Sequence, residues 1–241
     1  MSSYKGHTIF AFILSLVMFY DPFAIALAVI GANIPDFDHE FRRNHVLIII
    51  SLGIILTLFL YLLNLPVYLG IIISLLGLIF LFSSHRGFTH SIPGAIVLGI
   101  SLFLLVYFGM DLSSYFSLST ISNIPLKFII LAVVIVFLSV LFLKKELSII
   151  LIVSIALFIA LLSFGIIPPF KINVYVLIFS IFLGLFSHII MDSFTPAGIK
   201  VFSPFSDRKY HKKLGILLLV LIVVSYLFLF FDKLLFLINL I

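Results

Sequence analysis

The sequence predicts an all-α, polytopic transmembrane helical bundle, and three observations support this fold class. First, 64% of the 241 residues are hydrophobic and only 10% are charged, whereas soluble domains are about half apolar and about a quarter charged. Second, the mean hydropathy is +1.42. Third, most apolar runs are about 18 to 21 residues long, which suits helices that cross a hydrocarbon core of about 30 Å. We expect one integral membrane domain over residues 1–241, with about seven full spans after a short N-terminal helical hairpin.

The first apolar stretch, residues 8–34, is interrupted by Asp21 and Pro22. Proline cannot continue a helix interior, and an aspartate before it favours a turn. Each half is about 12 residues, or about 18 Å of helix, which is too short to cross the bilayer. We interpret the stretch as a helical hairpin that enters the membrane and returns. A single tilted span with a kink at Pro22 is the alternative.

Seven longer apolar runs follow, and short polar or proline-containing segments separate them. The predicted spans cover residues 46–64, 65–83, 92–110, 126–143, 147–167, 174–191 and 214–231. Pro66 and the pair Pro168-Pro169 mark turns, because proline lacks the N–H that a helix interior needs. The last apolar segment, residues 234–241, is too short to cross.

All the histidine-rich polar segments fall on one membrane face if the hairpin returns to its starting side. The positive charges follow the same division. Eleven lie on that face, namely Lys5, Arg42, Arg43, Arg86, Lys144, Lys145, Lys200, Arg208, Lys209, Lys212 and Lys213, and three on the other, namely Lys127, Lys171 and Lys233. Because cytoplasmic loops carry the excess of lysine and arginine, we expect a multi-pass protein of the plasma (inner) membrane with this face in the cytoplasm.

Three polar segments concentrate side chains that bind metals. They contain, in order, Asp36, Asp38 and His39; His85, Arg86 and His90; and His188 and Asp192. Residues four apart share one face of a helix, so His188 and Asp192 are expected to lie together. Ionisable residues at the end of an apolar span are costly to bury and indicate function. Taken singly, each segment is also consistent with a hydrogen-bonded polar cluster at the membrane surface.

Taken together with His7, the three segments predict a metal site. The candidate ligands are His7, Asp36, His39, His85, His90, His188 and Asp192. Because the chain contains no cysteine, all ligands must be nitrogen or oxygen. Zn²⁺ takes about four such ligands, so the set suffices for one ion or for two. Zinc is the expected metal, and manganese and iron remain alternatives.

The same motifs resemble the YdjM family of membrane proteins, which are regarded as metal-dependent hydrolases. The resemblance rests on residues 31–39, on the histidine segment 85–91, and on His188-x-x-x-Asp192 with the following Phe194-Thr195-Pro196, and it covers nearly the whole chain. The motif order is distantly similar to zinc-dependent phospholipase C and P1-type nucleases. That similarity implies as metal ligands His7, Asp36, His85, His90, His188 and Asp192.

The predicted function is a metal-dependent hydrolase at the cytoplasmic face, acting on a phosphoester of a membrane lipid or lipid-like molecule. Asp36 or Asp38 is the candidate general base. Arg86 and the basic segment 208–213 are candidates for binding an anionic headgroup. A metal-ion or solute transporter and a non-catalytic protein with a structural metal are the alternatives. We expect neither a nucleic-acid nor a protein partner, since basic cytoplasmic loops are ordinary in membrane proteins.

Overall fold

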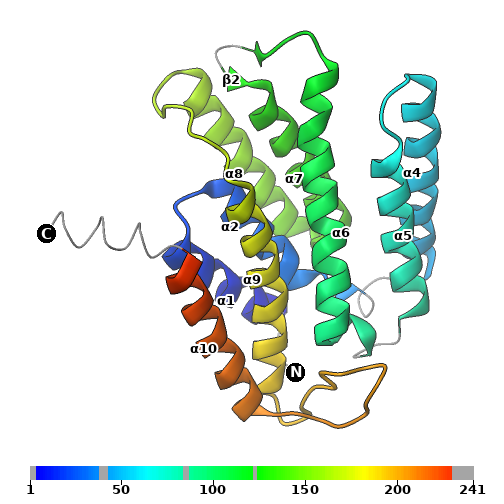
Figure 1. Ribbon diagram of the computed structural model, residues 1–241, viewed down its shortest axis with the longest axis vertical. Coiled ribbons are helices and arrows are strands. Elements are labelled where there is room, and N and C mark those ends of the chain that lie inside the picture. The colour runs from blue at the N-terminus through cyan, green and yellow to red at the C-terminus, as the bar shows by residue number, and fades with distance from the viewer. Residues whose placement is uncertain (1–3, 38–42, 84–86, 122–123, 230–241) are drawn as a thin grey trace, which may run out of the picture.

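The computed structural model describes residues 4–37, 43–83, 87–121 and 124–229. This part of the chain is mostly helical, as predicted, and most helices run up and down a single bundle (Figure 1). The α-helices are α1 (Tyr4–Met18), α2 (Pro22–Asn33), α4 (Arg43–Leu62), α5 (Tyr68–Phe82), α6 (Ile92–Asp111), α7 (Leu126–Phe142), α8 (Lys145–Ser163), α9 (Val174–Ser193) and α10 (Lys212–Leu229). Two 3₁₀ turns, η1 (Phe88–His90) and η2 (Leu112–Tyr115), lie on either side of α6.

Four of the described helices are long and apolar enough to cross a membrane. These candidate spans are Asn44–Leu62, Ile92–Tyr115, Lys145–Ser163 and Val174–Ser193. The spans predicted at residues 65–83 and 126–143 are shorter helices, α5 with 15 residues and α7 with 17. The predicted count of seven full spans is therefore not confirmed, although a helix occupies each predicted position.

The turn between α4 and α5 explains why α5 is short. Asn64 has a positive φ of 55°, and the amide of Leu65 donates to the carbonyl of Leu60 at 2.9 Å. This 6→1 hydrogen bond is typical of a helix C-terminus. The reversal uses the residues up to Val67, and α5 begins only at Tyr68.

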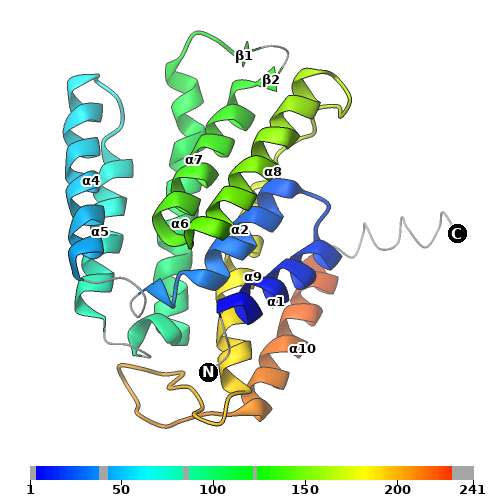
Figure 2. The ribbon, with the colours of Figure 1, turned by 180° about the vertical axis from the view of Figure 1, so that it is seen from behind.

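The helical break at Asp21 and Pro22 lies where it was predicted. Asp21 is the N-cap of α2, its side chain accepts a hydrogen bond from the amide of Phe23 at 2.9 Å, and Pro22 occupies the first helical position, where proline is favoured. The hairpin returns to its starting side, since Thr8 near the start of α1 donates to Asn33 at the end of α2, at 3.0 Å. Figure 2 shows that the start of α1 and the end of α2 lie close together.

Helix α2 is the centre of the core. Ten of its 12 residues are buried, and the helix packs against α1, α7, α8 and α9. A helix that is apolar on all sides is expected to be enclosed in this way. Its approach to α9 is especially close, because a Cβ added at Gly184 would meet the carbonyl of Ala28 and lie 2.9 Å from the amide nitrogen of Ala32.

The outer helices expose apolar stripes where a soluble protein would be polar. Ile54, Ile55 and Leu58 of α4 are each more than half exposed, and so are Ile150 and Val153 of α8. Such continuous exposed apolar surface indicates contact with lipid. It agrees with the membrane class predicted from composition.

A short β-hairpin and an isolated bridge between Ile199 and Tyr210 are the β-structure in the described residues. Strand β1 (Thr120–Ile121) pairs antiparallel with β2 (Ile124–Pro125), within a segment that was predicted to be a polar loop followed by a helix. The hairpin lies at the end of the bundle opposite the loop that joins α9 to α10 (Figure 1).

Candidate metal centre

The last turns of α9 supply the deepest part of the site. His188 and Asp192 lie one turn apart on this helix, with Nε2 of His188 3.6 Å from Oδ2 of Asp192, as their spacing predicted. A hydrogen bond at Nδ1 orients the ring of His188, because Nδ1 lies 2.7 Å from the carbonyl oxygen of Ala32 on α2. A carbonyl oxygen can only accept, so Nδ1 carries a proton and Nε2 faces the site, with a lone pair available to a metal when the imidazole is neutral.

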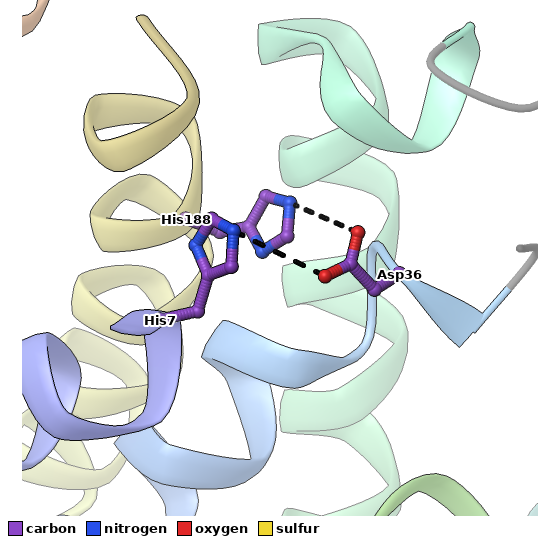
Figure 3. A group of neighbouring side chains, drawn as sticks. All are labelled: His7, Asp36 and His188. Carbon is purple, nitrogen blue, oxygen red and sulfur yellow. Dashed lines mark ion pairs between the residues drawn. The ribbon is translucent and has the colours of Figure 1, made fainter. Parts of the chain in front are cut away.

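The N-terminal hairpin brings His7 and Asp36 to the same point. His7 stacks on the ring of His188, with ring centroids 3.9 Å apart and an angle of 12° between the planes. Asp36, which follows α2, places Oδ1 3.7 Å from Nε2 of His188 and Oδ2 4.0 Å from Nε2 of His7 (Figure 3). The hairpin therefore contributes one ligand-type side chain from each of its two ends.

The segment before α6 supplies the third histidine. Ser91 is the N-cap of α6, accepting a hydrogen bond from the amide of Gly94 at 3.1 Å and donating to the carbonyl of Phe88 at 2.6 Å. These bonds hold the 3₁₀ turn that presents His90. Nε2 of His90 lies 3.2 Å from Oδ1 of Asp36, and Thr89 lies 3.1 Å from the other ring nitrogen.

All six histidine–aspartate pairs in this group are close. Nε2 of each histidine lies between 3.2 and 4.0 Å from an oxygen of each carboxylate. The three histidines are at most 1% exposed and Asp192 is 5% exposed, whereas the side chain of Asp36 is 20% exposed. The five side chains thus form a buried cluster that opens toward solvent at Asp36. We call the group His7, Asp36, His90, His188 and Asp192 the metal cluster.

The donor atoms of the metal cluster fit a divalent cation. Among the described residues, Nε2 of His188 has no hydrogen-bond partner, although two carboxylates lie 3.6 and 3.7 Å from it. If the imidazole is neutral, its lone pair is repelled by carboxylate oxygens at this distance, and a proton or a metal ion between them would remove that repulsion. Two ligands of a tetrahedral Zn²⁺, each about 2.1 Å from the ion, lie about 3.4 Å apart. The observed separations are close to that value.

Within the described residues the geometry favours one ion rather than two. The possible metal-binding triads are His7, Asp36 and His188, and His90, His188 and Asp192. Both triads need Nε2 of His188, and a single nitrogen lone pair binds a single ion. A set of three imidazoles and two carboxylates suits zinc, manganese or iron.

The charge state of Asp36 is consistent with this role. Burial opposes its ionisation, but the hydrogen bond with His90 and the attraction of His188, His90 and His7 in their protonated forms outweigh burial, so its pKa lies below the usual value. Asp36 is therefore a carboxylate at neutral pH, the form that binds metal.

Four residues predicted for the site cannot be compared with the structure. Asp38, His39, His85 and Arg86 lie outside the described residues. Of the seven predicted metal ligands, five are brought together: His7, Asp36, His90, His188 and Asp192.

Two residues that support the cluster were not predicted. Asn33 is 1% exposed, accepts a hydrogen bond from Thr8 at 3.0 Å, and donates to the carbonyl of Val29 at 2.7 Å. Thr8 follows His7 directly, so this contact locks the histidine-bearing turn of α1 against α2. An amide within an apolar run was the available signal for Asn33, since a buried amide requires partners.

The α9–α10 loop, residues 194–211, covers the cluster. Ile199 and Tyr210 exchange two backbone hydrogen bonds of 2.9 Å, and the amide of Ile92 donates to the carbonyl of Val201 at 2.8 Å. The second contact ties the loop to the segment that carries His90. Gly198 has a positive φ of 65°, and a Cβ there would lie 2.7 Å from the ring of His211, so the tight turn requires glycine.

Fold and site together define a helical membrane protein with a buried histidine–aspartate cluster that could hold a metal ion. The chain belongs to the YdjM inner membrane protein family, whose family model matches residues 1–239. Comparisons with curated proteins and with solved structures found no match.

Proposed function

We propose that this inner-membrane protein is a divalent-metal-dependent hydrolase that cleaves a phosphoester of a lipid or lipid-like molecule at the cytoplasmic face. The observation that carries the proposal is the convergence of three imidazole nitrogens and two carboxylates within 4.0 Å, beside a cavity of about 370 Å³ that Asp192 lines. A purely structural metal site is normally closed. The partial exposure of Asp36 and this cavity favour a site that a substrate can reach.

A divalent ion held by the metal cluster would acidify water and offset the charge of a phosphate group. The described residues supply two other requirements of hydrolysis, an oriented metal ligand and a general base. His188 is oriented by the carbonyl of Ala32, which keeps its Nε2 aimed at the cluster. Asp36 or Asp38 is the general base in this proposal, since the carboxylate of Asp36 is partly exposed and an oxygen that does not bind the ion can accept a proton from water. Asp38 and Arg86 remain predicted contributors to base catalysis and headgroup binding.

The distribution of positive charge supports the cytoplasmic orientation. At the end of the bundle near the metal cluster, the connections between helices carry Lys144, Lys200, Arg208 and Lys209, and Lys145 begins α8. The turns at the other end carry Lys171 just before α9, with Lys127 in the first turn of α7. By the positive-inside rule, this distribution favours a cytoplasmic location for the end that carries the cluster.

A lipid substrate is favoured by the surroundings of α9. This candidate span carries Asp192 in its last turn, and together with α10 it forms a second, apolar cavity of about 190 Å³ lined by Phe179, Phe182 and Phe186. An apolar cavity along the helix that leads to the cluster suits an acyl or isoprenoid chain.

The transporter alternative is less well supported. Transporter sites are typically formed at broken helices near the bilayer midplane. The break in this chain is at Asp21, which caps α2 through the amide of Phe23. The metal cluster forms instead at the opposite ends of α1 and α2, where His7 and Asp36 lie.

The decisive measurement is the metal content and phosphoester hydrolysis of the detergent-solubilised protein. We expect one zinc, manganese or iron ion per chain in the wild type. Asp36→Ala and His188→Ala should each lose the ion and reduce turnover of phosphatidic acid or isoprenoid phosphates by at least about a hundredfold, since even residues behind metal ligands contribute that much.

His45→Ala is the matched control, because His45 is an exposed histidine of α4 outside the cluster. It should retain both metal and activity. Full metal occupancy and turnover in Asp36→Ala and His188→Ala would refute the site. Metal-dependent flux in proteoliposomes without hydrolysis of any phospholipid would instead establish a transporter.

A further inference from the structure

The α9–α10 loop encloses the cavity of about 370 Å³ introduced above, beside the metal cluster. Asp192 forms part of its wall, and Lys200, Ser203, Asp207 and Lys209 form another part. Its volume falls within the range of about 300–1,000 Å³ that is usual for small-molecule sites. One member of the metal cluster and two lysines therefore line the same cavity.

The loop holds Lys200 in a defined place. Its neighbours on both sides are anchored, Ile199 by the paired bonds to Tyr210 and Val201 by the bond from Ile92. Val201 is fully buried and Ile199 is 4% exposed. Phe202 also packs edge-on against Tyr210, with centroids 5.7 Å apart. Such anchoring lowers the entropic cost of binding a ligand.

Lys200 already binds an anionic oxygen. Its Nζ lies 2.6 Å from Oδ1 of Asp207, a side chain that is 92% exposed. The hydrogen bond from Lys200 lowers the pKa of Asp207, so the pair is charged at neutral pH. Exposed ion pairs contribute little to stability, and an incoming anion can therefore replace the carboxylate of Asp207 at modest cost.

We propose that this cavity is a phosphate-binding subsite in which Lys200 and Lys209 bind the phosphate group of the substrate. In the absence of phosphate, Asp207 forms an ion pair with Lys200, and phosphate then replaces its carboxylate. The proposal rests on the proposed function in placing that phosphate next to Asp192 of the metal cluster. Ser203 adds a hydroxyl that can donate to a phosphate oxygen.

Phosphate is the ligand that this combination of groups favours. Two ammonium groups present compact positive charges of the kind that bind phosphate. With Asp207 displaced, both lysines are available to a doubly charged anion. The phosphate could belong to a lipid headgroup or to a soluble phosphate ester, since both present the same chemistry to the lysines.

The test is isothermal titration of the detergent-solubilised full chain with inorganic phosphate. Lys200→Gln and Lys209→Gln should each weaken phosphate binding by about tenfold, the loss expected for one charge-assisted hydrogen bond. Asp207→Asn should strengthen binding by about threefold, because it frees Lys200 from an exposed ion pair.

Lys171→Gln is the control for general electrostatic attraction. Lys171 is exposed in the segment just before α9, at the other end of the bundle, carries the same charge, and does not line the cavity. It should change phosphate affinity by less than about twofold, as expected for a distant, screened surface charge. Equal weakening by all three lysine substitutions, or no weakening by Lys200→Gln and Lys209→Gln, would overturn the proposal.

Titrations with glycerol phosphate and with dihexanoyl phosphatidic acid distinguish the two sources. Tighter binding of the acylated compound identifies a lipid headgroup, and equal binding identifies a soluble phosphate ester. Both results support the subsite if the two lysine variants weaken binding. The readout does not require turnover. Phosphate binding in this pattern without any hydrolysis would support the subsite and contradict the proposed function. Hydrolysis that is unchanged in the Lys200 and Lys209 variants would support the proposed function and contradict the subsite.

Discussion

At the residue scale, the metal cluster draws its five side chains from four separate parts of the chain, and contacts between those parts hold the side chains in place. The chemical types of His7, Asp36 and His90, and the helical spacing of His188 and Asp192, were sufficient to nominate all five. The acceptor for His188 was not predictable, because it is the backbone carbonyl of a residue 156 positions away in the sequence. Any residue type offers a carbonyl, so only the packing of α2 on α9 reveals this contact.

Asn33 provides a test of positioning at this scale. Asn33→Ala removes one of the two acceptors of Thr8, the other being the carbonyl of Tyr4 in the same helix, and also removes the donor to Val29. The variant should free the turn that carries His7 from α2. We expect metal affinity, measured by competition with a chelator, to fall by about tenfold or more, the usual effect of losing a residue that supports a ligand.

The matched control is Asn173→Ala. Asn173 caps the start of α9 by accepting from the amide of Tyr175 at 2.9 Å, at the end of that helix remote from His188. Its loss should cost about 1 kcal/mol of stability and leave metal affinity unchanged. Equal metal affinity in the two variants would remove Asn33 from the support of the site.

At the element scale, local signals in the sequence predicted where the helices are interrupted more accurately than how long they are. Pro22 and Asp21 define the hairpin because proline and N-cap chemistry act over a few residues. The start of α5 was placed three residues too early, since hydropathy does not distinguish the apolar residues of a turn, such as Leu65 and Val67, from those of a helix. The close packing of α2 on α9 depends on small residues opposite one another, and their pairing is not visible in either segment alone.

Gly184 tests this packing. In Gly184→Ala the new Cβ meets backbone atoms of Ala28 and Ala32, which cannot rotate away, so α2 and α9 must separate. Because Ala32 orients His188, we expect the variant to lose most of its metal, as measured by elemental analysis of the purified protein. Small residues at such interfaces allow helices in membranes to approach closely.

Gly109→Ala is the control for this substitution. A Cβ at Gly109 would meet only the side chain of Val134, at 2.6 Å from Cγ2, and that side chain can adopt another rotamer. Gly109 lies in the last turn of α6, far along the helix from His90. Metal content should remain at the wild-type level, and a similar loss in both variants would mean that the α2–α9 approach is not what positions His188.

At the scale of the whole molecule, the distribution of positive charge and the number of membrane crossings predicted that the metal-binding residues share one membrane face. Five of these residues do lie together in the metal cluster, and the α9–α10 loop lies at the opposite end of the bundle from the β-hairpin (Figure 1). The number of full spans was overestimated, since α5 and α7 are shorter than the apolar runs that contain them. The cavity under the α9–α10 loop was not predictable either, because long-range contacts such as that between Ile92 and Val201 shape the loop.

The orientation in the membrane can be tested directly because the chain has no cysteine. Lys213→Cys and Ser117→Cys introduce single exposed thiols at the two ends of the bundle. In intact spheroplasts a membrane-impermeant maleimide should label Ser117→Cys and not Lys213→Cys, because the positive face is expected in the cytoplasm. Inside-out vesicles should give the reverse pattern, and the opposite pair of results would assign the metal cluster to the periplasmic face.

The return of the N-terminal hairpin next to the last turn of α9 has a consequence for biosynthesis. His7, Asp36 and His90 are all made early, whereas His188 and Asp192 follow about a hundred residues later, or about 5–20 s at ordinary rates of translation. A nascent chain thus holds an incomplete ligand set through most of its synthesis. The centre matures only when α9 inserts beside α2, so capture of metal would mark the completion of membrane assembly rather than begin it.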